Sequence, residues 1–255
     1  MSKYSVLWVA DEENRRDYRA RQLYANAKGA ICFIEGHHNA NMYSVDINGD
    51  GVADVDAPGV ADNPTSVLVC DNASAKSMDM GTYFAAECAK AFKIPNRGLV
   101  VRKPGERGYY NLYYTNMPAV LLEPLYVSDA EVAVIAQSEH ARDTIAQLIA
   151  NMVRKYFPNG GVVAFSVGHL FKLSSKWDRG APVVGTGGKV AEGDLVLEYM
   201  RKAAELLLTG KNIGDAPEEV QLEPLEGGGG LVKLVGLWEV VEQKDGVTTI
   251  RQSAA

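Results

Sequence analysis

The sequence predicts an α/β fold, built on a mostly parallel twisted sheet that is covered by helices. Short runs of β-branched and apolar residues alternate with segments of helical periodicity, which is the pattern typical of parallel sheets. The chain has 255 residues, of which 47% are hydrophobic, and this is enough for one sizeable core. We therefore expect one α/β domain, with room for a small appendage.

Six apolar runs are candidates for the strands of this sheet. They are SVLWVA (5–10), AICFIE (30–35), SVLVCD (66–71), GLVVR (98–102), AVLLE (119–123) and VVAFSV (162–167). Helical periodicity is clearest at about 14–27, 76–92, 129–157 and 192–209. The third helical segment begins at Ser128 and Asp129, which are typical N-cap residues, and the fourth ends at Gly210, a typical C-cap.

The composition changes after residue 210. A loop with Pro217, Pro224 and four consecutive glycines leads into two β-type runs, which are separated by Asp245-Gly246. An Asp-Gly pair between two such runs predicts a β-hairpin. We therefore expect a main domain over residues 1–210 and a loop with a small C-terminal β-hairpin over residues 211–255.

Charge and cysteine content exclude several classes of protein. The formal charge of -6 gives no electrostatic reason to expect nucleic acid or an anionic membrane as a partner. Cys32, Cys70 and Cys88 lack the short spacing of a metal or redox motif, so we expect reduced core thiols. No apolar window approaches the roughly 18 residues of a membrane span, and the first residues do not resemble a signal peptide. We expect a soluble protein without membrane insertion.

Histidines are rare in this chain, and three of the four follow predicted strands. His37 and His38 come after 30–35, His169 comes after 162–167, and Glu123 ends a third strand. In open α/β sheets ligands bind beyond the carboxyl ends of the strands, so these side chains can converge. Zinc in hydrolases takes three His or Glu ligands and leaves one position for water. The alternative, that the histidines are unrelated loop residues, stays open on spacing alone.

Three longer segments resemble blocks of one known family. RQLYANAKGAICFIEGHHNA (21–40) is similar to the family's R-x-x-x-A-N stretch and its strand ending in S-I-H-A-N-A. MPAVLLEPLYVSD (117–129) resembles its M-P-A-V-L-V-E-x-G-F-x-S-N block. Residues 162–208 resemble its block with G-H-G-G, D-x-G-A and a glutamate that opens a helix. The family that these segments resemble is the zinc-dependent N-acetylmuramoyl-L-alanine amidases of type 3. The resemblance implies a phosphorylase/hydrolase-like fold and hydrolysis of the amide bond between N-acetylmuramic acid and L-alanine in peptidoglycan.

The resemblance also implies roles for four residues. His37, His169 and Glu192 would hold Zn²⁺, and Glu123 would be the catalytic base. Residues 178–181 (DRGA) would supply the D-x-G-A step. The block 162–208 stands at the start of the family's domain and near the end of this one. We therefore expect a circularly permuted domain.

The chain departs from the family's pattern next to its predicted ligands. Glu35 and Gly36 precede His37 where the family has Ser-Ile, Leu170 follows His169 in place of glycine, and Pro124 follows the base. These departures put the loop shape and the fit of the substrate in question more than the metal. Three roles are open for Glu35. It is a competing metal ligand, a residue that hydrogen-bonds to a ligand, or one partner of a salt bridge at the strand end.

A second metal signal lies in DINGDGVAD (46–54). Asp46, Asn48, Asp50 and Asp54 occupy alternate positions around a glycine, which resembles the start of a Ca²⁺ loop. The glutamate that closes an EF-hand is missing, because Ala57 stands there. The sequence therefore favours a β-type calcium loop, with an Asp- and Gly-rich solvated turn as the alternative.

The resemblance makes peptidoglycan the expected partner and cell-wall lysis the expected process. It implies an enzyme made without a signal peptide, in the cytoplasm or carried by a phage as an endolysin, that acts on the cell wall. Two alternatives remain open at this point. One is a zinc amide hydrolase that acts on another peptide or acyl amide, and the other is a cell-wall-binding or structural protein without catalysis.

Overall fold

The computed structural model divides the chain into two compact units, Met1–Ile213 and Gly214–Ala255. The structure describes residues 2–9, 17–40, 63–169, 171–173, 176–213, 219–222, 238–244 and 247–252. Each unit is described by itself below.

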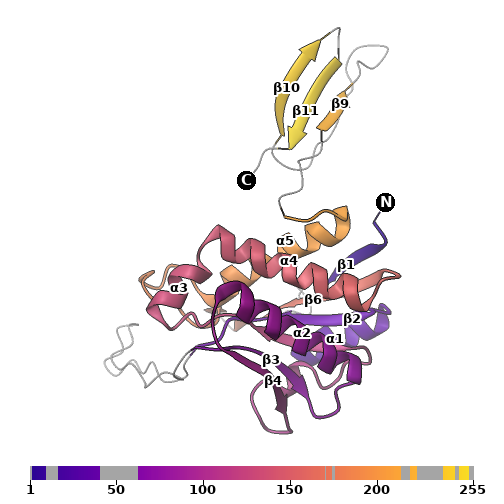
Figure 1. Cartoon of the computed structure of the whole chain (residues 1–255). Coiled ribbons are helices and arrows are strands. Elements are labelled where there is room, and N and C mark those ends of the chain that lie inside the picture. Colours follow the sequence, from indigo (N-terminus) through magenta and orange to yellow (C-terminus); the bar gives the residue numbers. More distant parts are fainter. Residues whose placement is uncertain are drawn as a thin grey trace. The chain divides into compact units, whose positions relative to one another are not determined.

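A six-stranded sheet in the order β1-β6-β2-β5-β3-β4 organises the first unit (Figure 1). Its strands are β1 (Tyr4–Trp8), β2 (Cys32–Gly36), β3 (Thr65–Cys70), β4 (Asn96–Arg102), β5 (Ala119–Glu123) and β6 (Gly161–Val167). All neighbouring pairs are parallel except β3 and β5, which are antiparallel. The prediction of a mostly parallel sheet is confirmed, and each predicted strand run corresponds to one of these strands.

Strand β6 lies between β1 and β2 and is parallel to both. Its register places Tyr4 opposite Gly161 on one side and Gly36 opposite Val167 on the other. The carboxyl ends of β2 and β6 therefore meet at the same edge of the sheet.

Helices cover both faces of the sheet, and strand residues alternate between them. Ile34 and Val67 point into one buried cluster, together with residues of α2, α4 and α5. Phe33 and Leu68, the adjacent positions, point into a second cluster, which includes residues of α1 and of a 3₁₀ turn, η1. This two-residue period is the one that a pleated strand imposes. The helical segments are α1 (Tyr18–Ala27), α2 (Ala75–Phe92), η1 (Tyr109–Asn111), α3 (Ala130–Ala136), α4 (Glu139–Tyr156) and α5 (Glu192–Thr209).

The continuous helix predicted over 129–157 is wrong, because the structure has two helices there. Asp129 caps α3 by accepting hydrogen bonds from two backbone amides, as the sequence predicted. Ser138 then caps α4 by accepting from Ala141 N at 3.1 Å. A serine that binds backbone groups in this way starts a new helix and ends the continuity of the old one.

Three further features complete the described part of the first unit. Strands β7 (Phe171–Leu173) and β8 (Lys176–Asp178) form a short antiparallel pair after β6, which the sequence analysis did not predict. All three cysteines are free and buried, as predicted. Within the described residues, no helix has the length and apolarity that a membrane crossing requires.

The second unit contains a three-stranded antiparallel sheet in the order β10-β11-β9. Strands β10 (Trp238–Lys244) and β11 (Val247–Gln252) pair where the sequence predicted a hairpin. The predicted turn, Asp245-Gly246, lies outside the described residues. Strand β9 (Glu219–Leu222), which pairs with β11, was not predicted.

Candidate active site

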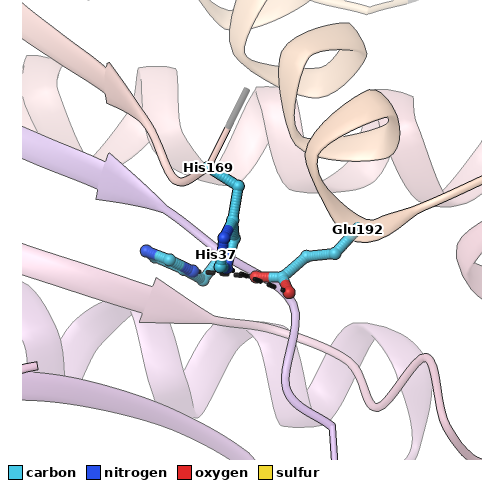
Figure 2. Close-up of side chains that lie close together, drawn as sticks. All are labelled: His37, His169 and Glu192. Carbon is cyan, nitrogen blue, oxygen red and sulfur yellow. Dashed lines mark hydrogen bonds and ion pairs between the residues drawn. The ribbon is translucent and has the colours of Figure 1, made fainter. Parts of the chain in front are cut away.

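Three predicted ligands come together beyond the carboxyl ends of two neighbouring strands. His37 follows β2, His169 follows β6, and Glu192 is the first residue of α5. Figure 2 shows the three side chains converging on one point. Each offers one ligand atom, and these atoms all lie within 4.8 Å of one another. The interpretation of the histidines as unrelated loop residues is therefore wrong.

The Glu192 carboxylate bridges the two histidines. Its Oε1 lies 2.8 Å from His37 Nδ1, and its Oε2 lies 3.4 Å from His169 Nε2. The two imidazole rings stand edge to face with their centroids 5.0 Å apart. Glu192 is only 2% exposed and His37 only 7%. The cluster is thus shielded from bulk water, which strengthens every charge interaction within it.

Backbone amides hold the Glu192 carboxylate as well. His38 N donates to Oε1 at 3.1 Å, and Ala181 N donates to Oε2 at 3.2 Å. Burial raises the pKa of Glu192, but the neighbouring imidazoles of His169 and His37 outweigh this effect and bring the pKa well below its usual value. Glu192 is therefore an ionised carboxylate with a fixed orientation, as a metal ligand requires.

His169 has an unusual backbone, and Asp178 positions its ring. Its φ of 64° lies in the left-handed region, which non-glycine residues rarely adopt. Asp178 Oδ2 lies 3.0 Å from His169 Nδ1, and Asp178 Oδ1 accepts a hydrogen bond from Gly180 N at 2.9 Å. A Cβ on Gly180 would lie 2.7 Å from Glu192 Oε2. The predicted D-x-G-A step thus packs directly against two of the ligands.

These residues fit a zinc ion. His169 Nε2 is buried and has no hydrogen-bond partner among the residues that the structure describes. It faces Glu192 together with His37 Nδ1. Two imidazole nitrogens and one carboxylate oxygen form a typical donor set of zinc hydrolases. An orphaned buried nitrogen in such a cluster is the atom that a metal ion would satisfy.

Glu123 lies in the same cavity but outside this cluster. It ends β5, the strand next to β2, and lines a cavity of about 470 Å³ together with the three candidate ligands. Its Oε2 is buried without a hydrogen-bond partner in the described part of the chain. Burial raises the pKa of Glu123 to about 7, although the charge of His37 opposes the shift. Glu123 is therefore a carboxyl group that titrates near neutral pH beside the candidate metal centre.

The rest of the cavity lining is basic and aromatic in part. Arg97, Arg102 and Arg107 belong to the lining, as does Tyr18. The chain as a whole carries a net charge of -6, so this concentration of arginines is local. Arginines in a cavity lining attract anionic groups of a ligand.

A buried polar network lies behind His37, and sequence reasoning identified only part of it. Glu35, which is 0% exposed, contacts His37, Ser166 and Asn111 through hydrogen bonds. Arg21, equally buried, donates to Ser166 Oγ at 3.1 Å. From the sequence, Glu35 has several alternative roles and Arg21 belongs to a family-like stretch. Asn111 and Ser166 could not be identified from the sequence, because their spacing along the chain gives no signal.

The predicted calcium loop cannot be placed in this geometry. Asp46, Asn48, Asp50 and Asp54 all lie outside the described residues. The calcium site stays a prediction from the sequence.

Comparisons with known proteins point to one family. A family model described as N-acetylmuramoyl-L-alanine amidase (Amidase_3) matches residues 2–155. This range includes His37 and Glu123 and ends before His169 and Glu192. A search of curated proteins found no match.

Three of the solved structures that resemble the chain are described as N-acetylmuramoyl-L-alanine amidases. The catalytic domain of CwlV from Bacillus (Paenibacillus) polymyxa var. colistinus is 22% identical, with a TM-score of 0.43, and the match covers 56% of this chain and 66% of that one. An amidase from Clostridium difficile 630 is 19% identical, with the same coverage and TM-score. AmiC2 of Nostoc punctiforme is 23% identical, with a TM-score of 0.40 and coverage of 55% and 65%. The chain thus spans just under two thirds of the length of these structures.

Proposed function

The chain belongs to the Amidase_3 family of N-acetylmuramoyl-L-alanine amidases, and on this premise we propose that it hydrolyses the bond between N-acetylmuramic acid and L-alanine in peptidoglycan. The observation that carries the proposal is the convergence of His37, His169 and Glu192 beside Glu123 in one cavity. Two histidines, a ligand carboxylate and a separate carboxyl group are the parts that a zinc amide hydrolase needs.

His37, His169 and Glu192 would hold the zinc ion. Zinc bound there supplies Lewis acidity, which polarises the amide carbonyl and lowers the pKa of a water molecule. The chain supplies the orientation. Asp178 fixes the ring of His169, and the backbone amides of His38 and Ala181 fix Glu192.

Glu123 would move the proton. Its raised pKa lets it accept a proton from the attacking water near neutral pH and give that proton to the leaving amide nitrogen. Amide nitrogen leaves poorly until it is protonated. The same carboxyl group can therefore act first as the general base for the water and then as the general acid for the leaving nitrogen. Arg97, Arg102 and Arg107 in the cavity lining would bind anionic groups of the peptidoglycan peptide.

The test measures new L-alanine amino termini released from purified peptidoglycan by the zinc-loaded protein. We expect release by the wild type, and for Glu123→Gln a loss of about 10²- to 10⁴-fold in rate with nearly unchanged zinc affinity. Glu131→Gln, at an exposed position in the first turn of α3, is a control with the same change in charge. Zinc binding without release by the wild type would point to a different amide substrate.

We further propose that the domain is circularly permuted, with the catalytic domain over 1–210 and the remainder as an appendage. The end of α5 adjoins the start of β1, because Ser2 Oγ donates to Leu207 O. This is the connection that the family's order of segments requires. A rearranged chain, with residues 158–213 placed before 2–157 through a short linker, should fold and bind zinc like the first unit. Failure to fold would count against the permutation.

The candidate calcium loop over 46–54 also remains a proposal, supported by its spacing alone. Its occupancy is tested by calcium titration of the wild type beside Asp50→Asn. Equal affinities would show that the segment is a solvated turn.

A further inference from the structure

Each candidate histidine ligand contacts a second carboxylate through the ring nitrogen that faces away from Glu192. For His169 this partner is Asp178, which belongs to the family-like D-x-G-A step. For His37 the partner is Glu35, whose Oε1 lies 3.0 Å from Nε2, while Nδ1 faces Glu192 at 2.8 Å. Glu35 occupies the position where the family's S-I-H stretch has serine, so this second contact is a feature of this chain.

Donors from two other elements bind the Glu35 carboxylate, and an arginine from a third element binds one of these donors. Ser166 of β6 donates to Oε2 at 2.8 Å, and Asn111 of η1 donates to Oε1. Arg21 of α1 donates to Ser166 Oγ at 3.1 Å and to Val167 O at 2.8 Å, which places a buried cation next to the buried anion. Glu35, Ser166 and Arg21 are each 0% exposed. A carboxylate held in this way has one orientation available, with Oε1 directed at His37.

The backbone just after β6 passes close to the ring of His37. A Cβ on Gly168 would lie 2.4 Å from Nε2 and 2.3 Å from Cε1, so this edge of the ring has no free space beside it. Nδ1 on the opposite side is the nitrogen that reaches the cluster with Glu192 and His169. A neutral imidazole has one N–H donor and one acceptor nitrogen, and a carboxylate can only accept.

We propose that Glu35 is a positioning residue that keeps the proton of His37 on Nε2 and thereby makes Nδ1 the metal-binding atom. The inference rests on the proposed zinc site. A carboxylate behind a ligand histidine fixes the ring and its tautomer and increases the basicity of the coordinating nitrogen, and loss of such a partner typically costs 10- to 100-fold in metal affinity. The structure offers this support to both histidines, through Asp178 of β8 and through Glu35 of β2.

The first experiment needs no variant. Long-range ¹H–¹⁵N spectra of the zinc-loaded wild type identify which nitrogen of His37 carries the proton. We expect a proton on Nε2, strongly shifted downfield by its hydrogen bond to a carboxylate, and zinc on Nδ1. A proton on Nδ1 with zinc on Nε2 would overturn the proposal.

The second experiment compares zinc affinity, measured by competition with a chromophoric chelator, between wild type and Glu35→Gln. We expect a Kd about 10- to 100-fold higher in the variant, and an upfield shift of the His37 Nε2 proton. Glu131→Gln, with the same change in charge on α3, should leave both unchanged. A folded Glu35→Gln protein with the wild-type Kd would refute the role of Glu35 and leave the proposed function intact. A wild type that binds no zinc would overturn both.

Discussion

Replacement of Gly168 with alanine should displace one zinc ligand without changing any functional group. The new Cβ would lie 2.3 Å from Cε1 of His37 and 2.6 Å from Gly36 O. Ordinary contacts of a Cβ begin near 3.4 Å, so the ring must retreat by about 1 Å. The carbonyl cannot move away easily, because it accepts a hydrogen bond from Gly168 N at 2.8 Å. The clash therefore falls mainly on the histidine.

A retreat of about 1 Å is several times the tolerance of about 0.2 Å in a zinc–ligand distance. A displacement of His37 by this distance is equivalent to losing one of the three zinc ligands. We expect a Kd for zinc at least about 100-fold higher than in the wild type, which corresponds to about 2.8 kcal/mol of binding free energy. The metal-free protein should lose about 1–3 kcal/mol of stability through overpacking.

The assay is the chelator competition, with urea unfolding of the metal-free proteins beside it. Gly29→Ala is the control, because a Cβ at Gly29 meets nothing within 4 Å and only its φ of +64° opposes the substitution. That variant should lose about 1 kcal/mol of stability and keep the wild-type Kd. A folded Gly168→Ala protein with wild-type zinc affinity would show that the contact between β6 and His37 has been wrongly interpreted.

Three further predictions concern the buried groups. Arg21→Met should destabilise the metal-free protein by about 3–5 kcal/mol in urea unfolding, because it leaves the buried Glu35 carboxylate without its nearby cation; a loss below about 1 kcal/mol would argue against this pairing. Burial raises the pKa of Cys70 and Cys88 to about 12, so a disulfide reagent at pH 8 should label these thiols only as the protein unfolds, and rapid labelling of the folded protein would contradict their burial. The pKa of Glu123 is about 7 in the folded state and about 4.3 in an unfolded chain, so ionisation of this carboxyl costs stability increasingly as the pH rises between these values. The urea midpoint of metal-free Glu123→Gln, relative to that of the metal-free wild type, should therefore increase from pH 4 to pH 8. A difference in urea midpoint that does not change with pH would refute the raised pKa.

The secondary structure of the main sheet could be predicted because its signals are local. Runs such as AICFIE and VVAFSV are buried on both faces, so β-branched and apolar residues fill every position. The short strands β7, β8 and β9 were missed because three or four residues give too little periodicity to recognise. The division between α3 and α4 was missed because Ser138 acts through a cap, while the apolar pattern continues across it.

The sequence by itself determined the donor types of the site and their place at strand ends, because residue type and strand periodicity are properties of short segments. His37, His169 and Glu123 could be named for that reason, with Glu192 added by resemblance to a family. Only the tertiary structure decided that β6 inserts between β1 and β2, and so brings His169 beside His37 across more than 130 residues of chain. It also decided that Glu35 faces His37 while Ser166 and Asn111 hold it there. Such contacts join residues far apart in sequence, and they depend on the packing of whole elements, which local patterns do not encode.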